Sequence, residues 1–138
     1  MSQDPTRPAA EETEAPAAAL QQLALRLQDF AQRRDWGQFH SPKNLASALI
    51  VEAGELLEHF QWLTEEQSRN LPADKKQAVA HEMADVLLYL VQMATALDVD
   101  LIEAANAKVE INGEKYPVEQ TQATDGGTVN SSQRPSHG

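Results

Sequence analysis

The segment DKKQAVAHEMADVLLYLVQMATAL, residues 74–97, has the strongest helical pattern in this sequence. Its large apolar side chains recur mostly at spacings of three and four, which is the period of an amphipathic helix. They are Val79, Met83, Val86, Leu87, Leu90, Met93 and Leu97. Because this apolar stripe is wide, we expect the helix to contact more than one neighbouring element. The segment therefore predicts a helical protein.

Three other segments show the same periodicity, and none shows the sustained alternation of a β-strand. We expect these helices at about residues 17–34, 41–63 and 100–111. The second should begin at Ser41-Pro42, because serine caps exposed amide groups and proline suits the first helical turn. Residues 63–73 are predicted to form a loop or short turn, and Asn112-Gly113 a turn after the last helix. Four helices with short connections predict an all-α, four-helix bundle-like fold.

The chain of 138 residues is long enough for one domain. Residues 1–16 and 119–138 contain few large apolar side chains, so we expect disordered tails around one domain at 17–118. That domain can bury only limited surface, since aromatic residues make up 5% of the chain. We therefore predict a homo-oligomer, a dimer or a tetramer, in which helices are shared between subunits.

The net charge of −10 argues against a nucleic-acid-binding protein, because an acidic surface repels the phosphate backbone. A ligand that carries phosphate would need cations to bridge it to the acidic groups. The sequence has no cysteine, which excludes a disulfide framework and a thiolate metal site. It also has no signal-peptide pattern and no long uncharged apolar run, so we expect a cytoplasmic protein without a membrane partner.

Two pairs of acidic residues interrupt or border the apolar stripes of successive helices. Glu52 and Glu55 form the first pair, and Glu82 and Asp85 repeat the three-residue spacing on the next helix. Carboxylates beside leucine and valine repel one another unless a cation compensates them. An all-oxygen set of ligands favours Mg²⁺ or Mn²⁺ over zinc. The alternative is that these acids belong to ordinary solvated helix faces, as we expect for Glu58.

Other kinds of catalytic site find less support in the sequence. A carboxylate-bridged di-iron bundle normally uses Glu-x-x-His, and no histidine here has glutamate three residues before it. We therefore expect the four histidines to be surface or structural residues: His40, His59, His81 and His137. A Gly-rich phosphate loop, a G-x-S-x-G motif and an H-E-x-x-H motif are also absent.

The sequence resembles the all-alpha nucleotide pyrophosphohydrolase superfamily in two segments taken together. They are VEAGELLEHFQW (51–62), which contains E-x-x-E, and HEMADVLLYLV (81–91), which contains E-x-x-D. The resemblance is to the MazG-like group, and within it to the dCTP pyrophosphatase branch. It extends to RDWGQFHSPKNL (34–45) and KVEINGEKYP (108–117), and it covers about residues 20–118. It implies hydrolysis of a nucleoside triphosphate to the monophosphate and pyrophosphate. Such a reaction depends on positioning and charge stabilisation more than on a protein nucleophile.

On the family pattern, Glu52, Glu55, Glu82 and Asp85 coordinate Mg²⁺, or Mn²⁺ in its place, and Glu55 is the candidate catalytic base. The resemblance also implies six substrate-binding residues: Trp36, Trp62, Tyr89, Lys108, Asn112 and Tyr116. The two tryptophans would stack on the base, and Trp62 would reach the site of a neighbouring subunit. Their other interpretation is that they are core or interface residues.

The sequence departs from the eukaryotic dCTP branch at Leu27, where those proteins place a histidine nine residues before the tryptophan. The favoured hypothesis is a house-cleaning hydrolase of dCTP or modified dCTP. A second hypothesis is a broader enzyme that also accepts dUTP, dTTP or damaged purine triphosphates. A third is a catalytically silent helical module that senses nucleotide. Small changes in a base pocket alter specificity, so the preferred base stays open.

Overall fold

The computed structural model describes residues 9–118 and is all-helical over that range. The parts of the predicted tails in residues 1–8 and 119–138 lie outside the described residues. The helices, in chain order, are α1 (Ala9–Arg33), the 3₁₀ helix η1 (Gly37–Phe39), α2 (Pro42–Glu58), α3 (Glu65–Arg69), α4 (Ala73–Leu97) and α5 (Leu101–Lys115). None of these helices is long and apolar enough to span a membrane.

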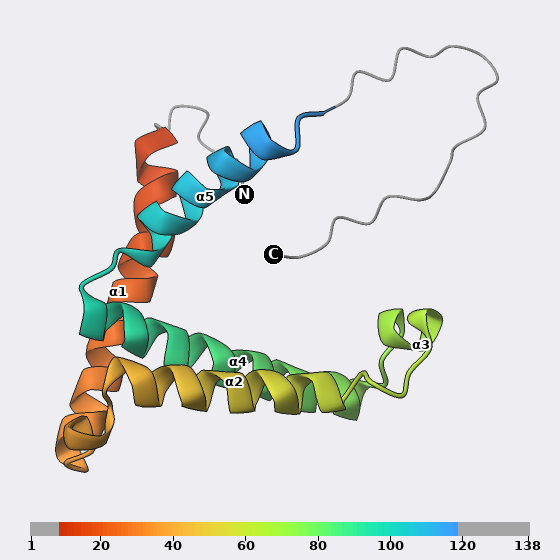
Figure 1. The fold of residues 1–138 in the computed structure, drawn as a ribbon, viewed down its shortest axis with the longest axis horizontal. Helices are drawn as coiled ribbons and strands as arrows, with labels where there is room; N and C mark the ends of the chain where they lie inside the picture. The colour runs from red at the N-terminus through yellow and green to blue at the C-terminus, as the bar shows by residue number, and fades with distance from the viewer. Residues whose placement is uncertain (1–8, 119–138) are drawn as a thin grey trace, which may run out of the picture.

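The centre of the fold is the pair formed by α2 and α4, which lie side by side along their lengths (Figure 1). Helix α1 packs against α4 at one end of this pair, whereas α5 extends away from it (Figure 1). The buried apolar side chains of the described residues all come from α2 and α4: Leu45, Val79, Val91 and Ala94. The α2–α4 pair therefore supplies the rigid frame on which the candidate site is built.

The start of α2 confirms the cap expected from the sequence. The Ser41 Oγ accepts a hydrogen bond from the Asn44 N–H at 3.2 Å, and Pro42 occupies the first helical position. This bond satisfies one of the amide groups that have no partner inside the helix. The Asn44 side chain also donates to the Phe39 carbonyl at 2.9 Å, which ties the 3₁₀ segment to α2.

We expect Ser41→Ala to lower the free energy of unfolding by about 1 kcal/mol, because the first turn of α2 loses its side-chain cap. Ser47→Ala is the matched control, since the Ser47 hydroxyl only bonds back to the Lys43 carbonyl within the same helix. Urea denaturation of both variants measures the difference. Equal stability of the two variants would show that the Ser41 cap contributes nothing.

Several expected boundaries were wrong. Helix α1 begins at Ala9 rather than near residue 17, with Pro16 inside it, because alanine and glutamate in this stretch are strong helix formers. Helix α2 ends at Glu58, and turns lead from there to α3. Helix α3 replaces the expected loop because Thr64 and Gln67 form a capping box.

The predicted turn at Asn112-Gly113 was also wrong. Helix α5 continues through both residues to Lys115, where the N–H of Tyr116 bonds the Asn112 carbonyl. A glycine inside a helix costs only about 1 kcal/mol relative to alanine, which the flanking helical residues offset. Most of the segment KVEINGEKYP (108–117) therefore lies on helix α5.

Candidate active site

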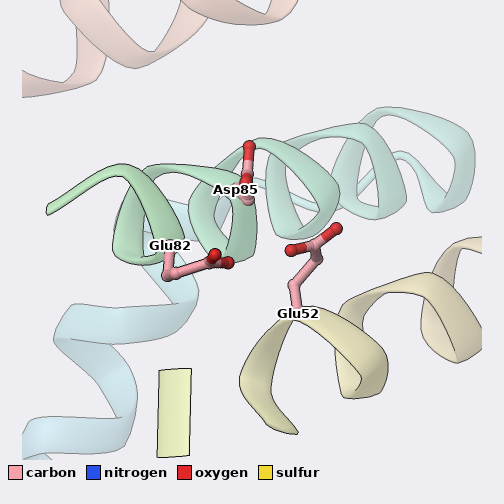
Figure 2. A group of neighbouring side chains, drawn as sticks. All are labelled: Glu52, Glu82 and Asp85. Atoms are coloured by element: carbon pink, nitrogen blue, oxygen red, sulfur yellow. The ribbon is translucent and has the colours of Figure 1, made fainter. Parts of the chain in front are cut away.

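Three carboxylates meet between α2 and α4. Glu52 extends from α2 towards α4, which carries Glu82 and Asp85 one turn apart (Figure 2). One carboxylate oxygen from each residue lies within 4.8 Å of the other two. The structure thus brings together three of the four acids expected to bind metal. Glu55 lies one turn further along α2 as a neighbour of Glu52, but it is not one of these three residues.

Two oxygens of this acidic group are buried and have no hydrogen-bond partner. They are Oε2 of Glu52 and Oε2 of Glu82. Among the described residues, the ion pairs join Asp29 to Arg33 and Glu65 to Arg69, so no basic side chain compensates the group. Buried oxygens without partners are costly, and a divalent cation with a preference for oxygen ligands removes that cost. The residues present therefore fit Mg²⁺ or Mn²⁺.

The pKa of Glu52 reflects the burial of its carboxyl group among other acids. Desolvation by burial is the main cause that raises the pKa of this carboxyl from 4.5 to about 7, and the neighbouring Glu55, Asp85 and Glu82 add to it. Between pH 4.5 and about pH 7, Glu52 thus holds a proton in the folded state that it has lost in the unfolded chain. A raised acid pKa makes the metal-free fold less stable as the pH rises through this range.

We expect metal-free wild type to lose stability relative to Glu52→Gln as the pH rises from about 5 to about 8. The glutamine cannot ionise, so the variant lacks this component of the pH dependence. Added Mg²⁺ should raise the Tm of wild type more at pH 8 than at pH 5, because the cation binds the ionised carboxylate. Thermal unfolding with and without Mg²⁺ measures both effects. Parallel Tm–pH curves for wild type and variant would contradict the prediction.

A cavity of about 160 Å³ adjoins the acidic group and is bounded by α1, the segment that follows it, α4 and Glu52 of α2. Glu52 and Asp85 form part of its wall, so the acids open directly onto it. The remaining wall is largely apolar and aromatic, with Leu27, Phe30, Trp36, Leu88 and Tyr89. Such a combination of apolar walls and a few polar groups is typical of ligand sites.

The end of α1 places Trp36 at this cavity. Asp35 adopts a left-handed conformation with φ of 53°, which reverses the chain after the helix. The Trp36 N–H then bonds back to the Ala31 carbonyl at 3.0 Å. The indole meets the Phe30 ring edge to face, with centroids 5.6 Å apart. Local backbone geometry and aromatic packing together hold the indole in position.

The predicted substrate-binding residues fall into two groups. Trp36 and Tyr89 line the cavity. Trp62 is 87% exposed in the turn after α2, and the other three lie on α5 or at its end, where their side chains are exposed. These three are Lys108, Asn112 and Tyr116. Within one chain, none of this second group lines the cavity beside the acids.

The cavity wall also contains residues that were not singled out as site residues from the sequence, among them Phe30, His40 and Gln92. Phe30 falls within the helix predicted at residues 17–34, and His40 was expected to be a surface or structural residue. Gln92 had a detectable signal, because it follows Asp85 by seven residues and so lies on the same face of α4. The acidic group formed by Glu52, Glu82 and Asp85 contains no histidine.

The fold and the acidic group define a class of protein: all-α, with carboxylates from two packed helices meeting beside an aromatic cavity. The chain belongs to the MazG-like family, whose model matches residues 48–126. It is 42% identical over 105 residues to dCTP pyrophosphatase 1 of Mus musculus, with 75% of this chain and 62% of that protein covered. It is 40% identical over 104 residues to the Homo sapiens protein of the same name, covering 74% and 61%. The chain thus spans about three fifths of the length of these relatives.

A solved structure supports the fold. A pyrophosphatase from Archaeoglobus fulgidus superposes with a TM-score of 0.68 and is 37% identical in sequence. The match covers 72% of this chain and 93% of the archaeal one. The all-α fold predicted from the sequence is thereby confirmed, and the resemblance to the MazG-like group is confirmed by the family match.

Proposed function

We propose that this protein is a Mg²⁺-dependent nucleoside triphosphate pyrophosphohydrolase, which converts its substrate to the monophosphate and pyrophosphate. The observation that carries the proposal is the group formed by Glu52, Glu82 and Asp85, which opens onto an aromatic cavity. The names of the relatives, dCTP pyrophosphatase 1 and a pyrophosphatase, support the same reaction.

The acids of α2 and α4 would hold the metal and so position the triphosphate next to the cavity. A bound Mg²⁺ would supply positive charge that offsets the negative charge developing on the phosphates. Glu55 lies outside the three-carboxylate group, one turn from Glu52, and is half-buried. We assign it the role of accepting the proton of the attacking water as the phosphoanhydride bond breaks and pyrophosphate leaves. Mn²⁺ offers the same oxygen coordination.

The preferred substrate in this proposal is dCTP or a modified dCTP. A cavity of about 160 Å³ suits a single base, because pockets for whole ligands usually measure about 300–1,000 Å³. Trp36 and Phe30 offer aromatic surface for that base. Removal of such nucleotides would limit their incorporation into DNA, which is a house-cleaning function.

A second copy of the chain would complete the site. Large apolar side chains on α2 and α4 are exposed in the single chain: Ile50, Val51, Leu57, Met83, Leu87 and Leu90. Large apolar side chains exposed in such number on two packed helices are typical of an interface between subunits. We propose a homo-oligomer in which Trp62 and the α5 residues Lys108, Asn112 and Tyr116 reach the site of a neighbouring copy. Their exposure and their absence from the cavity wall of their own chain support this arrangement.

The test is product analysis with a panel of natural and 5-modified nucleoside triphosphates, with Mg²⁺ and with excess chelator. We expect equal amounts of monophosphate and pyrophosphate, only in the presence of the metal, and the fastest turnover with dCTP or a 5-modified dCTP. Release of orthophosphate instead would contradict cleavage between the α- and β-phosphates. Nucleotide binding without any turnover would replace the enzyme hypothesis by the nucleotide-sensing module.

A further inference from the structure

Gln92 is a polar side chain in the wall of the cavity beside the acids. It follows Asp85 by seven residues on α4, which places it two turns along the same helix face, about 10 Å away along the axis. It lines both the 160 Å³ cavity and an adjoining cavity of about 330 Å³. Its side chain is half-buried. A nucleotide held at the acids by its phosphates would direct its base towards this residue.

The amide of Gln92 has a defined orientation. Its Nε2 donates a hydrogen bond to the Leu88 carbonyl at 3.1 Å. Because a carbonyl only accepts hydrogen bonds, the nitrogen must face Leu88, and the oxygen is the free end of the amide. Within the described part of the chain, no N–H or O–H group donates a hydrogen bond to Oε1. Gln92 therefore has a free hydrogen-bond acceptor, Oε1, beside the two cavities that it lines.

An acceptor at this position distinguishes between bases. Cytosine carries an exocyclic amino group that donates, whereas uracil and thymine carry an oxygen at the same ring position that only accepts. Apart from the acids, the other polar side chains of the cavity are the His40 ring and the Tyr89 hydroxyl, which do not present an acceptor alone and so do not select the amino group. Leu27, also in the cavity wall, adds no hydrogen bond.

We propose that Gln92 is a specificity-determining residue, whose Oε1 accepts a hydrogen bond from the exocyclic amino group of a pyrimidine base. The proposal rests on the proposed function, since it requires a nucleoside triphosphate in this site. A uracil or thymine base would place its oxygen against Oε1 and leave both acceptors unpaired. A site built around a hydrogen bond rejects an analogue that cannot form it.

The first test compares kcat/KM for dCTP and dUTP in wild type, Gln92→Met and Gln28→Met. Methionine has a similar volume to glutamine and no strong acceptor. We expect the preference for dCTP over dUTP to fall about tenfold in Gln92→Met, the effect of one hydrogen bond. Gln28 is a matched control, because it lines the adjoining cavity and not the one beside the acids. Gln28→Met should keep the wild-type ratio.

The second test changes the substrate instead of the protein. The pyrimidin-2-one deoxynucleoside triphosphate lacks the amino group and is compared with dCTP on wild type. We expect about a tenfold lower kcat/KM for this analogue on wild type and nearly equal values on Gln92→Met. This comparison stays decisive on wild type even if the variant does not fold.

The outcomes separate the two proposals. Wild type that releases no pyrophosphate from any nucleotide overturns the proposed function and this inference with it. Wild type that turns over dCTP but hydrolyses the analogue equally well overturns the role of Gln92 alone. If folded Gln92→Met keeps the wild-type ratio of kcat/KM for dCTP to kcat/KM for dUTP, the role of Gln92 is likewise overturned.

Discussion

Glu52→Gln should reduce the kcat for pyrophosphate release about a thousandfold, which corresponds to about 4 kcal/mol of transition-state stabilisation. Glu52 is the one carboxylate that α2 contributes to the three-acid group, and its Oε2 is buried without a partner. The amide keeps the size of the side chain but removes the negative charge that holds the cation. Steady-state assays at saturating nucleotide and Mg²⁺ measure the loss.

Glu58→Gln is the control for this substitution. Glu58 lies on the same helix, but it is exposed and does not belong to the acidic group. We expect its kcat to stay within about twofold of wild type, because an exposed acid contributes little. Comparable activity in Glu52→Gln and Glu58→Gln would show that the acidic group does not take part in the reaction.

Trp36→Ala should lower kcat/KM for the preferred nucleotide about 10- to 100-fold, with most of the change in KM. Stacking of a base on an aromatic ring contributes about 1–3 kcal/mol, and this contact forms on binding and persists during the reaction. Trp36→Phe retains an aromatic face and should recover part of the loss. The variant also loses the contact with Phe30, so its Tm is measured alongside.

Fluorescence provides an independent measurement of the same contact. The chain has two tryptophans, so Trp62→Phe leaves Trp36 as the single indole. We expect nucleotide binding to quench its fluorescence. Unchanged fluorescence at saturating nucleotide, together with an unaltered KM in Trp36→Ala, would exclude Trp36 from base binding.

The sequence was sufficient where the determinants are local or periodic. Ser41-Pro42 marked the start of α2 because capping depends on only a few neighbouring residues. The acids were detectable because Glu52 and Glu82 interrupt apolar stripes, and such positions face a neighbouring helix. Three of the four predicted acids meet in the structure for that reason.

The sequence was insufficient where contacts between distant segments decide the outcome. The cavity joins Phe30 and Trp36 to Gln92, and no periodic pattern links α1 with α4 at these positions. The spacing of Gln92 from Asp85 placed both residues on one face of α4, but only the packing of α1 against α4 showed that this face borders a cavity. The length of α1 and the helical course of α5 through Gly113 depended on the balance of helix propensity against single breaking residues.

The most direct test of the metal site is a Mn²⁺ titration followed by electron paramagnetic resonance of the free ion, with wild type, Glu52→Gln, Glu82→Gln and Glu58→Gln. We expect wild type and Glu58→Gln to bind Mn²⁺ with similar affinity, Mg²⁺ to compete for the site, and Glu52→Gln and Glu82→Gln to bind at least tenfold more weakly. Equal Mn²⁺ affinity in all four proteins, or none in wild type, would contradict a metal site at Glu52, Glu82 and Asp85.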